Sequence, residues 1–329
     1  MTQPPRIELA RLPTPLQPLD RFSAALGGPR IWIKRDDMTD TPASGNKLRK
    51  LEFSVGQALR EGADVLVTCG GVQSNHCRAT AIVASRLGLA SHLILRGKPV
   101  SPPDGNVLLD ELVGARLEYV TQTQYEELDA LYARVADEYR AQGMTPFIIP
   151  VGASDEIGLW GYITACEELK ADFERLNLRP GYLFSAAGSG GTLGGLIIGR
   201  QLHGLETQMV AFNVCDDEAW FNTKIANDIA TWQARYGIDL DMTNLAINIV
   251  DGYVGPGYGR ADPHVFDTIR TLAKTEGLIL DPVYTGKAFD AMVTEIRSGR
   301  FTDAGDVVFL HTGGIYGLFP QRDKFWEKL

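Results

Sequence analysis

Short apolar runs alternate with longer amphipathic segments along most of the chain. The runs are rich in β-branched and aromatic residues and are continuously apolar, which is typical of strands buried on both faces of a parallel sheet. Segments such as residues 124–142 and 287–298 are long and amphipathic enough for helices. The pattern predicts strands at residues 65–69, 92–95, 117–120, 147–151, 182–185, 209–214, 247–250 and 307–311.

This alternation predicts an α/β fold whose sheets are covered by helices on both faces. A chain of 329 residues exceeds the usual size of one hydrophobic core, so we expect two domains. The turn before Lys47 and the loop near residues 152–161 are the candidate boundaries. We therefore expect a larger domain of residues 1–49 and 161–329, a smaller domain of residues 50–160 inserted in it, and a ligand between them.

Composition and charge exclude several classes of protein. The chain has 44% hydrophobic and 22% charged residues, as in ordinary soluble proteins, and no apolar run reaches the length of a membrane span. The N-terminal residues lack the hydrophobic segment of a secretory signal, and the four cysteines show no paired spacing. A net charge of −9 with interspersed basic residues disfavours nucleic acid. We expect a cytoplasmic protein whose partner is a small molecule, neither nucleic acid nor membrane.

Lys47 stands where a glycine-containing turn runs into an apolar-periodic helix. A lysine near helix-terminal N–H groups and other cations can lose its proton and become a nucleophilic amine. Such a lysine suits a Schiff base to pyridoxal phosphate. From these residues alone, an ordinary solvated surface lysine is the alternative.

A second junction joins the strand at residues 65–69 to a helix over residues 79–87. Ser74 and Asn75 fall at the helix start, where free N–H groups attract an anion such as an amino-acid carboxylate. The alternative is that one of them only caps the helix, a contribution of about 1 kcal/mol. His76 with Cys69 and Cys77 lacks the close paired spacing of zinc ligands, so we expect no metal site.

A glycine-rich run follows the strand at residues 182–185. Glycines let the backbone approach a phosphate, whose charge the N–H groups and the helix terminus stabilise. The expected donors are Gly190, Gly191 and Thr192. The lysine of a Walker A loop is missing, which disfavours a nucleoside triphosphate.

Two alternatives remain for this run. Gly188, Gly190 and Gly194 have a dinucleotide-like spacing, and Asp216 and Asp217 follow the next strand, so a nicotinamide-dependent oxidoreductase stays open. The run also fits a turn that serves only tight helix packing.

Three turns in the C-terminal third carry polar side chains: Tyr258 in a glycine-rich turn, Tyr284 and Thr285 before a helix, and Thr312 after the last strand. Tyrosines in turns are usually packing residues with one hydrogen bond. Strand ends and glycine turns are nevertheless where α/β sheets place ligands.

Six motifs occur in one order along the chain: SGNKLRKLEF, GGVQSNHCR, GSGGTLGG, GPGYG, LDPVYTGKA and HTGG. Together they resemble the D-cysteine desulfhydrase and 1-aminocyclopropane-1-carboxylate deaminase family, from near residue 12 to near residue 319. These are pyridoxal-phosphate enzymes of the tryptophan synthase β-like fold (fold type II). The resemblance implies a two-domain, usually dimeric α/β enzyme with the cofactor between its domains.

For the cofactor, the resemblance implies that Lys47 is the Schiff-base lysine. Asn75 would flank the pyridine ring and its phenolic oxygen, and Thr285 would meet the pyridine nitrogen. The phosphate would be held by Ser189, Gly190, Gly191 and Thr192.

For the substrate, the resemblance implies that Ser74 lies beside the carboxylate and assists proton transfer, with Asn75, His76 and Thr312 also at the substrate. Tyr258 and Tyr284 would face the substrate's side chain and steer the leaving group. Lys47 would remove the Cα proton.

Thr285 separates the two branches of the family. In the deaminases an acid at this position keeps the pyridine nitrogen protonated, giving the strong electron sink that cyclopropane ring opening requires. Threonine is neutral and cannot supply that charge, and Thr312 likewise replaces the leucine of the deaminases. Both positions resemble the desulfhydrase branch, which implies α,β-elimination of D-cysteine to pyruvate, hydrogen sulfide and ammonia.

Some segments depart from the desulfhydrase pattern: residues 315–318, the acid Asp155, and the acidic–aromatic residues 216–221. They leave open an L-cysteate sulfo-lyase or a 1-aminocyclopropane-1-carboxylate deaminase on the same scaffold. A nicotinamide-dependent oxidoreductase and a catalytically silent binder are the distant alternatives.

Overall fold

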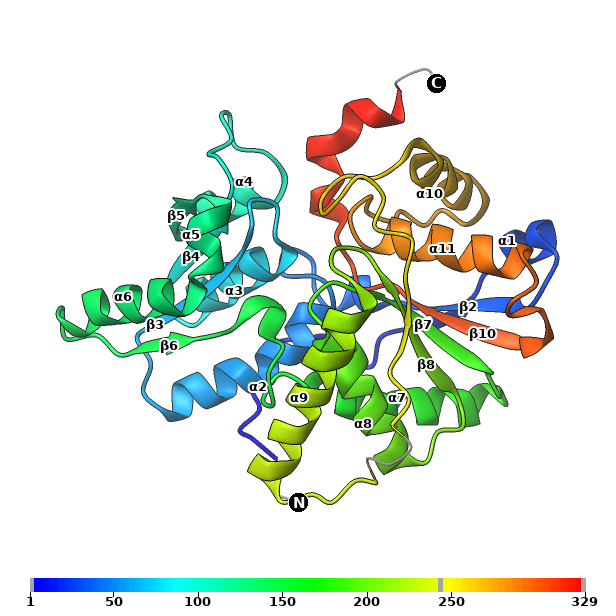
Figure 1. Ribbon diagram of the computed structural model, residues 1–329, viewed down its shortest axis with the longest axis horizontal. Helices are drawn as coiled ribbons and strands as arrows, with labels where there is room; N and C mark the ends of the chain where they lie inside the picture. The colour runs from blue at the N-terminus through cyan, green and yellow to red at the C-terminus, as the bar shows by residue number, and fades with distance from the viewer. Residues whose placement is uncertain (1–2, 242–244, 327–329) are drawn as a thin grey trace.

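The computed structural model describes residues 3–241 and 245–326, which are built around two sheets (Figure 1). The larger sheet has six strands in the order β1-β2-β10-β7-β8-β9, and only β1 runs antiparallel to its neighbour. Its strands are Leu16–Pro18 (β1), Arg30–Lys34 (β2), Tyr182–Ala187 (β7), Gln208–Asn213 (β8), Asn248–Val250 (β9) and Asp306–Leu310 (β10).

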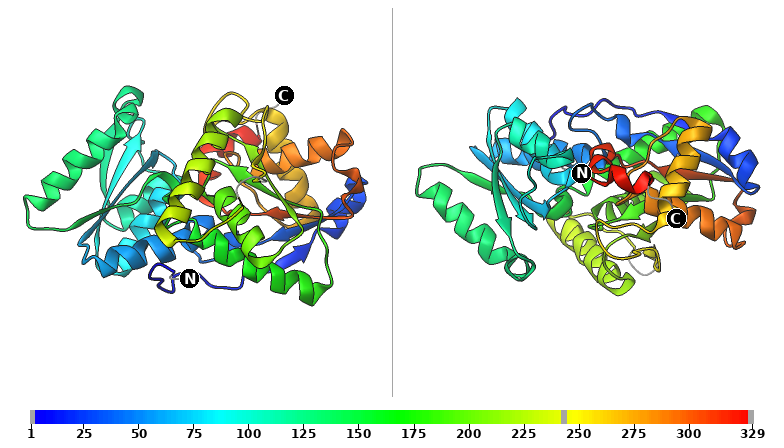
Figure 2. Two further views of the ribbon diagram at one scale, coloured as in Figure 1. Left: turned by 60° about the horizontal axis from the view of Figure 1, so that its bottom comes forward. Right: turned by 90° about the horizontal axis from the view of Figure 1, so that it is seen from above.

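The smaller sheet has four parallel strands in the order β5-β4-β3-β6. Its strands are Val65–Gly71 (β3), Ala90–Arg96 (β4), Arg116–Val120 (β5) and Pro146–Ile148 (β6). All four come from the chain between β2 and β7, and they form the cyan-to-green end of the molecule in Figure 2.

Eleven α-helices connect these strands within the described residues. They are Asp20–Leu26 (α1), Asn46–Arg60 (α2), Asn75–Arg86 (α3), Gly105–Leu112 (α4), Gln122–Glu126 (α5), Leu128–Arg140 (α6), Trp160–Leu176 (α7), Gly191–His203 (α8), Glu218–Tyr236 (α9), Pro263–Glu276 (α10) and Thr285–Arg297 (α11). In the larger sheet, α1, α10 and α11 cover one face and α7, α8 and α9 the other (Figure 1).

The continuous apolar strands are explained by this two-sided cover. In β7, Leu183 belongs to the same buried cluster as Trp160 of α7, whereas the next residue, Phe184, belongs to the cluster that contains Phe289 of α11. Successive side chains of a strand point to opposite faces, so a strand between two helix layers needs apolar residues at every position. The predicted α/β class with helix-covered parallel sheets is confirmed.

The predicted strands all occur, with ends that shift by a few residues. The prediction missed β1 and β2, which are short or bounded by charged residues. The helix predicted over residues 124–142 is wrong as one element: the backbone turns at Glu127 (φ −97°, ψ 40°) and divides it into α5 and α6. The domain boundaries at residues 49/50 and 160/161, which fall inside α2 and at the start of α7, stay a prediction.

A buried ionic cluster fixes α2 to the larger sheet. Arg49 donates to both carboxylate oxygens of Asp36 at 2.8 Å and to Glu168 at 2.9 Å. Tyr162 of α7 donates to Asp36 at 2.6 Å. Because Arg49 lies between Lys47 and Lys50 in sequence, this cluster sets the position of both lysines along the helix.

Candidate active site

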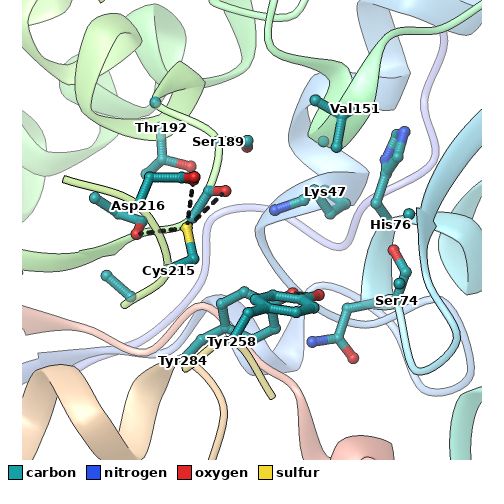
Figure 3. Close-up of a pocket in the computed structure, with 18 of the residues that line it drawn as sticks. Lys47, Ser74, His76, Val151, Ser189, Thr192, Cys215, Asp216, Tyr258 and Tyr284 are labelled. Atoms are coloured by element: carbon teal, nitrogen blue, oxygen red, sulfur yellow. Dashed lines mark hydrogen bonds between the residues drawn. The ribbon is translucent and has the colours of Figure 1, made fainter. Parts of the chain in front are cut away.

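A cavity of about 280 Å³ lies where the carboxyl ends of strands from the two sheets meet (Figure 3). Most of the residues predicted for the site line it: Lys47, Ser74, Asn75, His76, Ser189, Gly190, Thr192, Tyr258, Tyr284 and Thr312. Gly191 and Thr285 are buried and are not part of this lining.

Lys47 lies in the first turn of α2 and extends into the cavity (Figure 3). Its Nζ is 3.3 Å from Asn46 Oδ1. Burial, together with the positive charge of Arg78, lowers the pKa of Lys47 to about 8. The lysine is therefore not an ordinary surface residue, and its neutral, nucleophilic form is accessible near neutral pH.

The turn before Lys47 is held by the end of the last strand. Asn46 N donates to Thr312 O at 3.1 Å, and a Cβ at Gly45 would lie 2.7 Å from the same oxygen. Gly45 also has φ +115°, so only glycine fits there without strain.

Ser74 is the N-cap of α3, because its Oγ accepts from Cys77 N at 3.2 Å. Ser74 therefore caps the helix, and it also lines the cavity, so capping is not its only place in the structure. Asn75 Oδ1 accepts from Arg78 at 3.1 Å and from Asn106 at 3.2 Å. These bonds orient the amide so that its Nδ2 is the group left to donate.

His76 is buried, and its Nε2 lies 2.8 Å from Thr68 Oγ1. Burial, with the charges of Lys47 and Lys50, lowers the pKa of His76 well below its usual value. The imidazole is therefore neutral beside the cavity.

The glycine-rich run forms the opposite wall. Gly191 N donates to Ser154 Oγ at 3.2 Å, Ser189 Oγ accepts from Ser154 Oγ at 2.8 Å, and Thr192 Oγ1 accepts from Asn46 at 3.0 Å. Gly190, with φ +83°, turns the chain into α8. The first N–H groups of α8 have no intrahelical partner, as at any helix start.

Sequence reasoning missed Lys50, which stands behind this wall. Its side chain is fully buried, and its Nζ donates to two neutral oxygens of the described residues, Gly152 O at 3.1 Å and Ser154 Oγ at 3.4 Å. A Cβ at Gly191 would lie 2.9 Å from Lys50 Nζ. Burial, together with the charge of Lys47, lowers the pKa of Lys50 well below its usual value, so a negative partner is needed to hold its proton. A buried lysine and a helix N-terminus that meet at glycines fit a phosphate group, which supplies that negative charge. The spacing of three from Lys47 was the signal, because it places both lysines on one helix face.

Tyr258 and Tyr284 form a third wall, and their hydroxyl groups hydrogen bond to each other. Their rings are 6.0 Å apart at an angle of 68°. Burial raises the pKa of Tyr258 to about 12, so its hydroxyl stays protonated.

The hydroxyl group of Thr285 forms hydrogen bonds with Asp281 both as donor and as acceptor. It donates to Asp281 Oδ1 at 2.7 Å and accepts from Asp281 N at 3.0 Å. The same carboxylate accepts from the backbone N–H groups of Val283, Tyr284 and Thr285.

The unusual segments differ in their relation to the cavity. Tyr316 packs on Arg78, 4.8 Å from guanidinium to ring, and is not in the lining; Asp155 is also outside it. Asp216 and Trp220 do line the cavity, and Asp216 accepts from Cys215 Sγ at 3.0 Å. Asp217 is the N-cap of α9, where its side chain accepts from Trp220 N, and it is not in the cavity lining.

Among residues 3–241 and 245–326, no three His, Cys, Asp or Glu side chains converge as metal ligands would. Within the same ranges, none of the helices combines the length and the apolar character needed to cross a membrane.

The family model for pyridoxal-phosphate dependent enzymes matches residues 7–313. The chain is 40% identical to a D-cysteine desulfhydrase of Salmonella newport, over 98% of each protein. It is 37% identical to a bifunctional D-cysteine desulfhydrase/1-aminocyclopropane-1-carboxylate deaminase of Arabidopsis thaliana, over 96% of this chain and 80% of that protein. A solved structure of a 1-aminocyclopropane-1-carboxylate deaminase homologue superposes with a TM-score of 0.90 at 36% identity, over 98% of this chain and 96% of the other. The chain belongs to the family of pyridoxal-phosphate dependent enzymes.

Proposed function

We propose that this protein is a lyase that catalyses α,β-elimination on a β-substituted amino acid, with D-cysteine as the leading substrate. The observation that carries the proposal is Lys47, an amine of lowered pKa inside a cavity bordered by two helix N-termini. The names of the relatives support D-cysteine. An L-cysteate sulfo-lyase and a 1-aminocyclopropane-1-carboxylate deaminase are the alternatives.

Several residues have the chemistry to hold pyridoxal phosphate. Lys47 would bind its aldehyde, and Asn75 Nδ2 would donate a hydrogen bond to its phenolic oxygen. Its phosphate would lie at the start of α8 near Lys50, with Ser189, Gly190, Gly191 and Thr192 as the neighbouring residues. Bound there, the cofactor supplies an electron sink that makes the Cα proton of an amino acid removable.

The substrate carboxylate fits the start of α3 at Ser74 and Asn75. The Lys47 amine takes the Cα proton, with the Ser74 hydroxyl assisting. The Cα–H electrons form the Cα–Cβ double bond, and sulfur leaves with the Cβ–S electron pair beside Tyr258 and Tyr284. Addition of water to the unsaturated product gives pyruvate and ammonium, so D-cysteine and water become pyruvate, hydrogen sulfide and ammonium.

Thr285 supports elimination over ring opening. Its hydroxyl proton is directed to Asp281 Oδ1, so neither an acid nor a cation is contributed at this position. A weaker electron sink suffices when a good leaving group departs from Cβ.

We expect purified enzyme with bound cofactor to be yellow and to release pyruvate from D-cysteine. Rates should be compared for D-cysteine, L-cysteine, L-cysteate and 1-aminocyclopropane-1-carboxylate. Release of 2-oxobutyrate from the last compound would contradict the argument from Thr285. A colourless protein that pyridoxal phosphate does not turn yellow would overturn the whole proposal.

We also propose that the enzyme is a cytoplasmic homodimer, as the resemblance to the family implies. Light scattering on the purified protein measures its mass in solution, and the mass of a single chain would refute the homodimer.

Lys50→Met is expected to weaken cofactor binding by about 10- to 150-fold, since a charge-assisted hydrogen bond contributes roughly 1.5–3 kcal/mol. Methionine preserves the length of the side chain while removing its charge. Equilibrium titration of the apoenzyme with pyridoxal phosphate measures the effect. Lys98→Met, at an exposed lysine, is the control; equal affinities in both variants would remove Lys50 from the phosphate site.

The rate at which apoenzyme binds pyridoxal phosphate covalently is expected to rise with pH and level off above about pH 8, the pKa of Lys47. Only the neutral amine attacks the aldehyde, so the rate should fall about tenfold per pH unit below that pKa. Stopped-flow absorbance gives the profile. A flat profile from pH 6.5 to 9.5 would show that the Lys47 pKa does not control attachment.

A further inference from the structure

Arg96 is a cavity residue to which neither the sequence nor the proposed function assigns a task. It is the last residue of β4, pairs in register with Gly71 at the end of β3, and lines the cavity. It is half-buried, so its charge is only partly hydrated.

No acidic side chain of the described residues forms an ion pair with Arg96. Its guanidinium instead lies over two aromatic rings, 5.0 Å from the centre of Tyr125 and 5.4 Å from the centre of Tyr258. The one carboxylate in the described cavity lining, Asp216, follows β8 of the other sheet and accepts a hydrogen bond from Cys215 Sγ. A partly desolvated guanidinium without a counter-ion, stacked on aromatic faces, is prepared to bind an anion.

The position of Arg96 relates it to the substrate side chain. Tyr258 lies against Gly71, where a Cβ would be 2.9 Å from its ring, and Tyr284 lies against Gly188, where a Cβ would be 3.0 Å away. Arg96, Tyr258 and Tyr284 therefore make one continuous wall. Figure 3 shows the two tyrosines below Lys47, with Ser74, the residue proposed for the substrate carboxylate, further to their right in the view.

We propose that Arg96 and the two tyrosine hydroxyls form an anion subsite for the Cβ substituent, and that the enzyme accepts alanines whose Cβ carries a sulfonate, sulfate or phosphate group. The inference rests on the proposed elimination, whose substrate class it extends. The carboxylate binds at the start of α3, so a second negative charge on the substrate meets Arg96.

Arg96 acts on the departing group as well as on binding. In cysteate, the Cα–H electrons form the double bond and sulfite leaves with the Cβ–S pair, so cysteate and water give pyruvate, hydrogen sulfite and ammonium. Negative charge grows on the leaving group as the bond breaks, and a fixed guanidinium stabilises that charge.

The test compares charged and neutral leaving groups in the wild type, Arg96→Met and Arg96→Lys. For cysteate, O-sulfoserine and O-phosphoserine, Arg96→Met is expected to lower kcat/KM by about 10- to 150-fold, the effect of one charge-assisted hydrogen bond. For β-chloroalanine, whose substituent carries charge only as chloride departs, the loss of kcat/KM should be several-fold smaller, because the neutral bound substituent makes no ion pair with Arg96. Arg96→Lys keeps the charge and should recover part of the activity.

Equal losses on cysteate and β-chloroalanine would give Arg96 only a packing role and overturn the anion subsite. So would a wild type that eliminates chloride from β-chloroalanine but acts on none of the three charged substrates. Failure on β-chloroalanine itself would count against the proposed elimination.

Binding of 3-sulfopropanoate separates the two proposals, because this cysteate analogue has no amino group and cannot react. Calorimetry with the holoenzyme should show that it binds at least about tenfold more tightly than butanoate, and that Arg96→Met removes the difference. Equal affinities of the two acids for the wild type would overturn the subsite whatever the enzyme's activity.

Discussion

Lys47→Ala is expected to lower the rate of pyruvate formation by roughly 10³-fold or more. The variant loses the amine that attaches the cofactor and the base that takes the Cα proton, and a positioned base alone contributes about 10²- to 10⁴-fold. Initial rates with D-cysteine measure the loss. Borohydride should link the cofactor covalently to the wild type and leave the variant unlabelled, as peptide mass mapping would show.

Lys98→Ala provides the matched control, because Lys98 is exposed and outside the cavity. Its turnover should equal that of the wild type. The thermal unfolding of Lys47→Ala should stay close to that of the wild-type apoenzyme, since Lys47 makes only one weak hydrogen bond. A Lys47→Ala variant with near wild-type turnover would remove Lys47 from the mechanism.

Asp36→Asn is expected to lower the free energy of unfolding by about 3–5 kcal/mol, as when one partner of a buried ion pair is removed. The side chain of Arg49 is only 2% exposed and bonds to both oxygens of Asp36, so the substitution leaves a buried guanidinium with Glu168 as its remaining acid. Urea unfolding of the apoenzyme measures the difference. Asp137→Asn is the control, because its pair with Arg140 is largely exposed and contributes about 0–1 kcal/mol.

The ion pair of Asp36 and Arg49 also determines how the stability of the fold changes at low pH. Burial alone would raise the pKa of Asp36, but the charge and hydrogen bonds of Arg49 outweigh it and the net pKa is lowered. The stabilisation is therefore complete above the unfolded-state pKa of about 3.9 and is lost as the pH falls through the lower folded-state value. Asp36→Asn should flatten this part of the stability profile; a loss under about 1 kcal/mol at neutral pH would show that the cluster is not decisive.

Local patterns predicted those features of the fold that a segment specifies by itself. The β7 strand is apolar at successive positions because helices cover both faces of its sheet. The glycines at 190 and 191 are needed because neighbouring side chains lie too close for a Cβ. The resemblance to the family then implied that Lys47, Ser74 and Tyr284 belong to one site, and all three line the same cavity. None of these inferences required knowledge of which side chains from distant segments contact each other in the folded chain.

The missed features depend on tertiary partners. Arg49, Lys50 and Arg96 are basic residues of similar appearance in the sequence, yet one is paired with acids, one lies behind a glycine wall with neutral oxygens, and one lines the cavity. Their surroundings differ because each side chain meets a different distant segment: acids for Arg49, neutral oxygens for Lys50 and aromatic rings for Arg96. The kink at Glu127 was missed because helical periodicity persists across it.

The contact between Asn46 and Thr312 has a consequence for synthesis on the ribosome. The turn that carries Lys47 emerges early, but its hydrogen-bond acceptor belongs to a segment translated near the end of the chain. A nascent chain can pair the strands of the smaller sheet long before this turn has its partner. Cofactor capture therefore belongs to the completed polypeptide, and a premature stop before residue 312 would release a product without the anchor for its reactive lysine.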